Sequence, residues 1–166
     1  MADIEKKDPI RWGMVGGGQG SFIGEVHRIA ARLNNNYLFC AGALSSEPER
    51  SQKSGSALGL EKGRSYKNYE AMIEGESSRD DRIEAVSIVT PNDMHFPIAK
   101  RFLQEGFHVI CDKPMTVTTH EADELVELAN KQNLVFAVTY NYSGHPMVRH
   151  ARAMIENGEI GAIRVV

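Results

Sequence analysis

Five short apolar runs, separated by amphipathic or polar stretches, constrain the fold of this 166-residue chain more than any other feature. The runs lack a clean apolar–polar alternation, as is typical of parallel strands that are covered on both faces. The expected strands are residues 12–15, 37–44, 83–89, 107–111 and 134–138. Strand and helix in alternation predict an α/β fold, a doubly wound parallel sheet with right-handed crossovers.

The stretches between these runs predict helices. Expected helices cover residues 21–34, 45–59, 68–74, 94–106 and 118–133. Ser21 is placed to cap the first, a serine caps the second with Pro48 in its first turn, and Thr118 or Thr119 caps the last. The polar stretch 74–82 is expected to be an exposed loop.

Charge and cysteine usage narrow the class of protein. The net charge is −3 with both signs interspersed, which gives no nucleic-acid or anionic-membrane footprint. No apolar run approaches the roughly 18 residues of a membrane span, and the first residues do not resemble a secretory signal. Cys40 and Cys111 lie in expected strands, a setting that favours buried, reduced thiols over a disulfide framework. A cytoplasmic protein is therefore expected.

A glycine cluster follows the first expected strand and opens the first helix. Such a loop lets backbone N–H groups approach a pyrophosphate closely, although a glycine cluster alone is also typical of an ordinary turn. Gly16 and Gly18 supply the first pair of a G-x-G-x-x-G motif, but the third position falls on Ser21. Counting back from His27 gives the third place to Gly24, with an insertion near Ser21. The loop is then longer than usual, and we expect it to be more mobile.

The end of the second strand should meet the adenosine ribose of a bound dinucleotide. NAD enzymes usually carry Asp or Glu at this point, whereas this chain has Ser45 and Ser46, with Arg50 a turn into the next helix. Hydroxyls and a guanidinium suit a 2′-phosphate and favour NADP. The same residues also suit a helix cap and a solvated surface charge, so the choice between NAD and NADP stays open.

Two further loops end buried strands and carry polar residues. "VTPNDMH" places Pro91 and Asn92 in a turn near the nicotinamide end of a dinucleotide. The alternative is an ordinary strand-to-helix turn in which Asp93 caps the helix. "VICDKPMT" places Lys113 directly after a strand, beside Pro114, which restricts its backbone. A lysine held there can bond a substrate hydroxyl and relay its proton, while a surface lysine is the simpler alternative.

No metal site is expected. The six histidines are scattered, and the chain has no H-x-x-x-H or C-x-x-C pattern. It also lacks the motifs of a P-loop and of a nucleophile elbow.

The last residues suggest a second unit. A helix is expected over 147–161 and a strand over 162–166, where the sequence stops. We therefore expect a dinucleotide-binding domain over 1–139, and a linker helix and first strand of a truncated C-terminal substrate and dimerisation domain over 140–166. The alternative is a small domain whose final strand joins its own sheet.

Several motifs together resemble one family, the glucose-fructose oxidoreductase, inositol dehydrogenase and MocA (Gfo/Idh/MocA) oxidoreductases. They are the glycine loop with "GEVH", then "YKNYEAMI", "TPNDMH", "CDKP" and "YNYSGHP…IENGEIGAIR", in order from Arg11 onward. The resemblance implies a Rossmann NAD(P)-binding fold followed by a larger α/β domain. Three departures matter: the long glycine loop, Asp112 where the family usually has Glu, and catalytic Asp and His partners that belong to a domain outside this chain.

The resemblance assigns roles to individual residues. Lys113 becomes the catalytic lysine, and Gly24 joins the pyrophosphate loop. The cofactor-binding set is Gly16, Gly18, Gln19, Ser21, Phe22, Ile23, Ser45, Ser46, Arg50, Thr90, Pro91, Asn92, His95, Asp112 and Lys113. The substrate set is Lys113, Tyr140, Asn141 and His145.

The expected activity is an NAD(P)-dependent oxidoreductase that transfers a hydride between nicotinamide and a hydroxyl or keto carbon of a sugar or polyol. We expect a homo-oligomeric full-length protein, and a fragment of this length to be inactive by itself. The alternative from another class is a dinucleotide-binding sensor or partner-binding module without catalysis.

Overall fold

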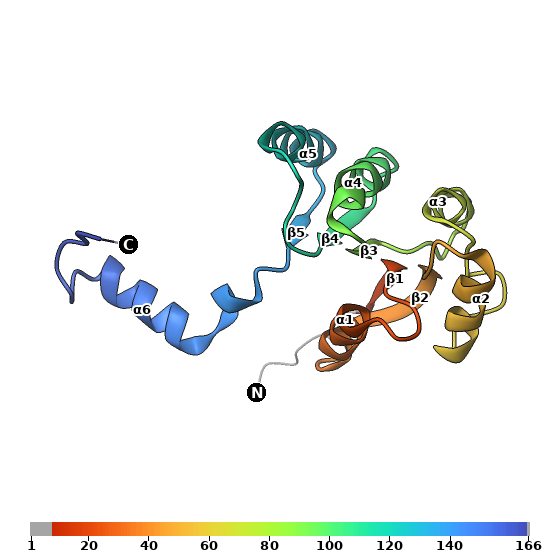
Figure 1. The fold of residues 1–166 in the computed structure, drawn as a ribbon, viewed down its shortest axis with the longest axis horizontal. Coiled ribbons are helices and arrows are strands. Elements are labelled where there is room, and N and C mark those ends of the chain that lie inside the picture. Colours follow the sequence, from red (N-terminus) through yellow and green to blue (C-terminus); the bar gives the residue numbers. More distant parts are fainter. Residues whose placement is uncertain (1–7, 166) are drawn as a thin grey trace.

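The computed structural model describes residues 8–165, which form one five-stranded parallel sheet in the order β2-β1-β3-β4-β5 (Figure 1). The strands are β1 Ile10–Gly16, β2 Tyr37–Ala43, β3 Ala85–Val89, β4 His108–Cys111 and β5 Phe136–Val138. Every strand expected from the apolar runs is confirmed, and so is the Rossmann architecture. The strand order reverses between β1 and β3, so the loops after these two strands form the switch point where ligands of such sheets bind.

A short segment extends the sheet beside β2. Gly42 N donates to Arg64 O at 3.0 Å, and Tyr66 N donates to Gly42 O at 2.8 Å, which makes a parallel bridge between Gly42 and Ser65. With this bridge counted as a minimal third strand, the order becomes the 3-2-1-4-5 of a dinucleotide-binding sheet.

Helices cover both faces of the sheet. The helices are α1 Phe22–Arg32, α2 Pro48–Ala57, α3 Tyr69–Ser77, α4 His95–Gln104, α5 Thr119–Gln132 and α6 Pro146–Glu156, with the short 3₁₀ turns η1 Asn92–Met94 and η2 Asn141–Gly144. α1 lies on one side of the sheet and α4 and α5 on the other (Figure 1). Among the helices that the structure describes, none is long and apolar enough to cross a bilayer.

The caps follow the sequence in two of three cases. Ser21 accepts from Gly24 N at 3.3 Å, and Thr118 forms a reciprocal capping box with Glu121, as expected. The expected serine cap of α2 is wrong, because Glu47 occupies the cap position and makes no side-chain bond there. Pro48 does begin that helix, where its missing N–H costs nothing.

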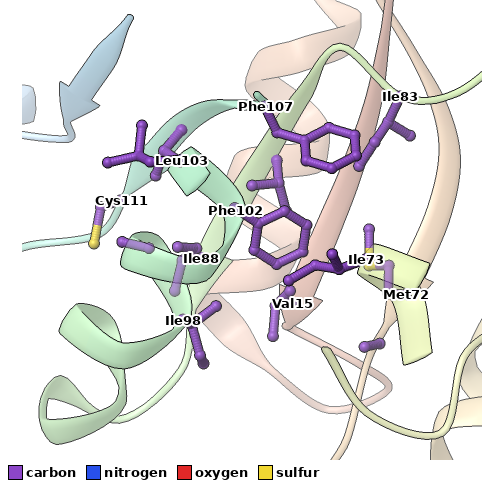
Figure 2. Packing of buried hydrophobic residues seen from close by; sticks show 14 of the residues in the cluster. Val15, Met72, Ile73, Ile83, Ile88, Ile98, Phe102, Leu103, Phe107 and Cys111 are labelled. Carbon is purple, nitrogen blue, oxygen red and sulfur yellow. The ribbon is translucent and has the colours of Figure 1, made fainter. Parts of the chain in front are cut away.

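The main core lies between the sheet and α3, α4 and α5 (Figure 2). Phe102 and Phe107 are fully buried and meet edge to face with ring centroids 5.6 Å apart. Labelled neighbours in the same cluster include Val15, Met72, Ile73, Ile83, Ile88, Ile98, Leu103 and Cys111. A smaller cluster with Trp12, Met14 and Leu44 lies on the face that α1 covers.

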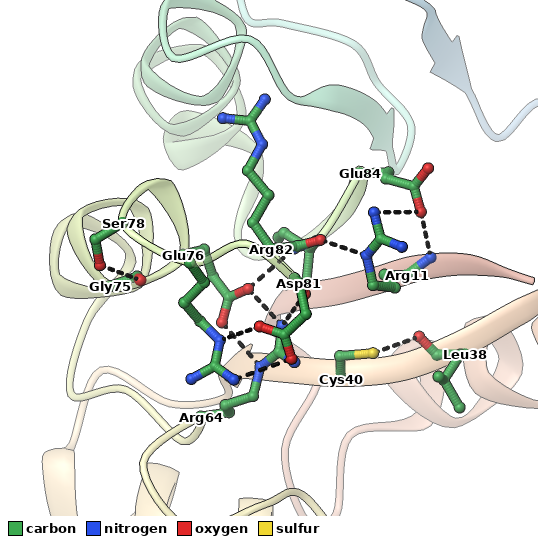
Figure 3. A network of polar contacts seen from close by, with 12 residues as sticks. Arg11, Leu38, Cys40, Arg64, Gly75, Glu76, Ser78, Asp81, Arg82 and Glu84 are labelled. Carbon is green, nitrogen blue, oxygen red and sulfur yellow. Dashed lines mark hydrogen bonds and ion pairs between the residues drawn. The ribbon is translucent and has the colours of Figure 1, made fainter.

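The expected loop over residues 74–82 is wrong in its first half. α3 continues to Ser77, and Glu76 is fully buried despite its polar neighbours. Glu76 accepts from Arg64 at 3.1 and 2.6 Å (Figure 3). It also accepts from Tyr66 Oη at 2.8 Å and from Ile83 N at 3.0 Å. This polar stretch therefore contributes Glu76 to a buried ion pair with Arg64, which ties α3 to the segment beside β2.

The C-terminal part leaves the sheet. After β5 the chain passes through η2 into α6, which extends away from the other elements (Figure 1). The strand expected over 162–166 is not formed in residues 162–165, because no neighbouring strand there supplies backbone partners, and Val166 lies outside the described residues. The division into two domains stays a prediction.

Candidate functional site

The glycine loop packs against the end of β2. Gly16 and Gly17 have positive φ angles of 78° and 71°, which L side chains rarely adopt. Gly18 N donates to Leu44 O at 3.0 Å, and a Cβ on Gly18 would lie 2.5 Å from that oxygen and 2.8 Å from Ser54 Oγ. Only glycine fits this position without displacing the backbone of the neighbouring strand.

Gly24 supplies the close helix–strand contact of the motif. A Cβ on Gly24 would overlap the backbone of Gly17, so α1 can approach β1 only with glycine here. This is the place that counting back from His27 assigns to the third glycine. The extra residues around Gly20 project outward, since a Cβ on Gly20 would meet nothing within 4 Å. The expected mobility of this loop stays a prediction.

Ser45 and Arg50 lie beside the glycine loop. Arg50 Nη2 donates to Gln19 O at 3.2 Å, and the residues from Gly17 to Ser21 line a hollow of about 160 Å³ with Leu44, Ser45 and Arg50. Ser46 is exposed and does not line this hollow. The structure therefore brings two of the three residues expected near the ribose to the loop.

Ser54 is a loop-ordering residue that the sequence reading missed. Its Oγ accepts from Gln19 N at 3.0 Å, and its side chain is fully buried under the loop. A small polar residue in an expected helix gives no sequence signal for this contact, which depends on how α2 lies against β2.

The loop after β3 meets the glycine loop at the switch point. A Cβ on Gly16 would lie 2.8 Å from Val89 O and 3.2 Å from Thr90 Cγ2, so the two loops touch. Thr90 Oγ1 is buried without a hydrogen-bond partner in the part of the chain that the structure describes. Pro91 and Asn92 are exposed, and Asp93 makes no cap bond.

His95 corrects the sequence-based assignment. It was expected beside nicotinamide and ribose, but its side chain is 0 % exposed and both ring nitrogens contact backbone carbonyls. A ring without accessible surface cannot touch a cofactor in the cleft. The pattern placed His95 at the start of α4 correctly, but it did not show that the first turn of this helix faces inward.

Lys113 lies at the carboxyl end of β4, exposed, on the wall of a cavity of about 720 Å³. Asp112 lines the same cavity and accepts from Thr139 Oγ1 at 2.8 Å, which fixes the carboxylate. Tyr140 and Asn141, at the start of η2, line the same cavity, whereas the exposed His145 is not among the lining residues. Phe22 and Ile23 line this larger cavity, not the hollow at the glycine loop.

A polar chain under the cavity was also missed by the sequence reading. Trp12 Nε1 donates to Ser87 Oγ at 2.9 Å, and His27 Nδ1 lies 3.3 Å from the same oxygen. Burial lowers the pKa of His27, and the nearby Asp112 offsets part of that shift. The sequence signal was "GEVH" itself, in which only the glycine received a role.

The residues present fit a dinucleotide. Gly18 leaves a cradle that a Cβ would fill, the hollow beside it contains Arg50, and Thr90 Oγ1 is a buried polar atom that lacks a partner. Backbone N–H groups at the start of α1 suit a pyrophosphate. Within residues 8–165, no group of three His, Cys, Asp or Glu side chains is placed to hold a metal ion.

Comparison with known proteins agrees with this geometry. Residues 10–140 match the Gfo/Idh/MocA family, described as an oxidoreductase family with an NAD-binding Rossmann fold. The oxidoreductase YfiI of Bacillus subtilis is 47 % identical over 159 residues, which are 95 % of this chain and 40 % of that protein. Levoglucosan dehydrogenase of Pseudarthrobacter phenanthrenivorans is 31 % identical over 158 residues, 91 % of this chain and 38 % of that one.

A solved structure is similar over nearly the whole chain. It is an inositol dehydrogenase homologue from Azotobacter vinelandii, complexed with NADH and myo-inositol, with a TM-score of 0.92 and 46 % identity. The match covers 95 % of this chain and 41 % of that one, so this chain spans about two fifths of the length of these relatives. With its sheet order, its glycine loop and this match over residues 10–140, the chain belongs to the Gfo/Idh/MocA oxidoreductase family and has its NAD-binding Rossmann fold.

Proposed function

We propose that this chain is the cofactor-binding part of an NAD(P)-dependent oxidoreductase that acts on a hydroxyl or keto carbon of a sugar or polyol. The observation that carries the proposal is that Lys113, Tyr140 and Asn141 line one cavity at the carboxyl ends of β4 and β5. Relatives named as levoglucosan dehydrogenase and UDP-N-acetylglucosamine 3-dehydrogenase support the substrate class.

The roles follow from the side chains. Lys113 donates a hydrogen bond to the substrate oxygen and holds or releases its proton, while Tyr140 and Asn141 bond other hydroxyls and orient the ring. Asp112, anchored by Thr139, places a carboxylate in the lining of the same cavity. The nicotinamide supplies the hydride acceptor or donor when the cofactor is bound.

The choice between NAD and NADP depends on Arg50. Its guanidinium is held at the hollow by Gln19 O, where it can pair with a 2′-phosphate. Calorimetric titration of both dinucleotides against the wild type and Arg50→Ala tests this. We expect the variant to lose affinity for NADP more than for NAD, and equal losses would rule out the phosphate contact.

Turnover is to be measured in a chimaera that joins this chain to the remaining part of the Bacillus subtilis relative. With a panel of sugars and polyols, Lys113→Ala should lower kcat by at least about a hundredfold, as loss of a general acid–base group does. A loss of only a few-fold, with dinucleotide binding intact, would favour the binding module without catalysis.

We also propose a homo-oligomeric full-length protein in the cytoplasm. Large apolar side chains at the two ends of α1 support an interface, since Phe22, its first residue, is 80 % exposed and Leu33, the residue after it, is 75 % exposed. The free thiols of Cys40 and Cys111 support a reducing compartment. Sedimentation of the chimaera tests the first proposal, and a monomer at all concentrations would contradict it.

A further inference from the structure

Arg28 of α1 reaches back to the glycine loop. Its Nη1 donates to Gly17 O at 2.6 Å and lies 3.5 Å from Met14 Sδ. Helical side chains lean toward the N-terminus of their helix, so a long side chain at position 28 extends over the turn that contains Gly24. The guanidinium thereby lies between α1 and the loop that follows β1.

The oxygen that Arg28 contacts is buried and needs a donor. Gly17 is a buried residue, and within residues 8–165 no other group donates to its carbonyl. A buried carbonyl oxygen without a donor is costly, so this contact satisfies a requirement of the folded chain. An arginine stays charged in proteins, and a hydrogen bond from a charged donor is of the stronger kind.

Gly24 and Arg28 contact the same oxygen. A Cβ on Gly24 would lie 2.5 Å from Gly17 O, so the absent side chain leaves the space that this carbonyl occupies. Arg28, one turn later on the same face of α1, provides the hydrogen bond. Neither residue lines the hollow at the glycine loop. The carbonyl therefore faces α1, and its partial negative charge is turned away from the hollow where an anion would bind.

The same peptide group is held from its other side. Gly18 N, which shares this peptide group with Gly17 O, donates at 3.0 Å to the carbonyl of Leu44, the residue after β2. The peptide group is therefore fixed by α1 at its carbonyl and by the end of β2 at its N–H. Glycines on both sides of it would otherwise allow it to rotate, because glycine populates positive and negative φ about equally.

We propose that Arg28 is a positioning residue of the dinucleotide site, which fixes the Gly17–Gly18 peptide group so that the glycine loop has its binding conformation before the cofactor binds. A loop that is ordered beforehand binds more tightly, because ordering it on binding costs free energy. If only a fraction of the loops is in the competent conformation, the apparent affinity falls by that fraction. The effect on turnover rests on the proposed function, whereas the orientation of the peptide group does not.

Nuclear magnetic resonance of the 166-residue chain without dinucleotide tests the contact in the wild type. A guanidinium that is bonded to Gly17 O should rotate slowly about its Cζ–Nη bonds and give separate Nη proton signals at low temperature. The exposed Arg32, also on α1, gives the averaged signals of a solvated guanidinium for comparison. Averaged Nη signals for Arg28 would overturn the proposal.

Hydrogen exchange of the Gly18 amide tests what the contact does. Arg28→Met keeps the apolar stem and removes the donor, so Gly18 N–H should exchange with solvent at least about tenfold faster than in the wild type. Arg32→Met removes the same charge from an exposed site on α1 and should keep the wild-type rate. Circular dichroism verifies the fold of each variant. If Arg28→Met unfolds, Arg28→Gln, which is shorter and uncharged, takes its place with the same expectation. An unchanged Gly18 rate would overturn the proposal.

Calorimetric titration with NAD tests the consequence for binding. Removal of the donor at Arg28 should weaken NAD binding by at least about tenfold, or 1.4 kcal/mol, while Arg32→Met should bind as the wild type does. Equal affinities of the Arg28 variant and the wild type contradict the positioning role. A failure of the proposed function appears elsewhere, as turnover that persists in Lys113→Ala, and leaves the readouts on Arg28 and Gly18 intact.

Discussion

The buried carboxylate of Glu76 offers the sharpest test of the energetics. Glu76→Gln keeps the shape of the side chain but removes its charge, while Arg64 stays 4 % exposed with its guanidinium still positive. Breaking a buried ion pair by removing one partner costs about 3–5 kcal/mol. The lower end, about 3 kcal/mol, is expected because Asp81 remains 3.3 Å from Arg64. That loss is a large fraction of the about 5–15 kcal/mol that stabilises a typical domain.

Urea unfolding, followed by circular dichroism, measures this loss. With a slope of about 2 kcal/mol/M, the midpoint should fall by about 1.5 M. The matched control is Glu156→Gln, which breaks the exposed pair with Arg152 and should leave the midpoint unchanged. A loss below about 0.5 kcal/mol for Glu76→Gln, the range of ordinary surface substitutions, would refute the reasoning.

Three further predictions concern the site. Gly18→Ala should weaken NAD binding by at least about tenfold, or 1.4 kcal/mol, because its Cβ meets Leu44 O. Gly144→Ala, whose Cβ would lie in open space, should leave the affinity unchanged. Equal calorimetric affinities of the two variants would contradict the requirement for glycine at position 18. Burial raises the pKa of Cys111 to about 12, so a disulfide reagent at mildly alkaline pH should label the half-buried Cys40 first, and faster labelling of Cys111 would be contrary to this structure. The pKa of His27 is lowered by burial, so the unfolded chain binds its proton at higher pH than the folded chain does, and stability should decline as pH falls below 6.5. The urea midpoint of His27→Gln should decline less over the same pH range. Identical midpoint–pH profiles for the variant and the wild type would exclude this contribution.

The fold could be read from the sequence because its strands are buried on both faces. Such strands leave continuous apolar runs, and all five were found. The prediction of an exposed loop over residues 74–82 was wrong because the sequence does not distinguish the buried Glu76 from the solvated polar residues around it. Its burial depends on Arg64, twelve residues away, and on the way α3 packs.

The site was most predictable where backbone geometry demands a residue type. At Gly18 and Gly24 the neighbouring backbone lies so close that no residue with a Cβ atom fits. His95 was misplaced because spacing shows where a helix begins and not which way its first residue turns. The contact of Ser54 with the glycine loop depends on packing between elements distant in sequence, so no local pattern indicates it. "GEVH" marks His27 but does not show that its partner is Ser87.

The segment beside β2 has a consequence for how the sheet meets other strands. Its bridge occupies both backbone groups of Gly42, and the Cys40 thiol donates to Leu38 O at 3.2 Å, so two places where an incoming strand would pair are already taken. β5 is the strand at the other edge of the sheet. It has three residues and, in the described part of the chain, pairs with β4 alone, so its outer side is open. Since unpaired edges recruit further strands, augmentation of this sheet is directional. A strand from the rest of a longer chain, or from a misfolded neighbour, should add beside β5, and blocking that edge is the place to begin against aggregation.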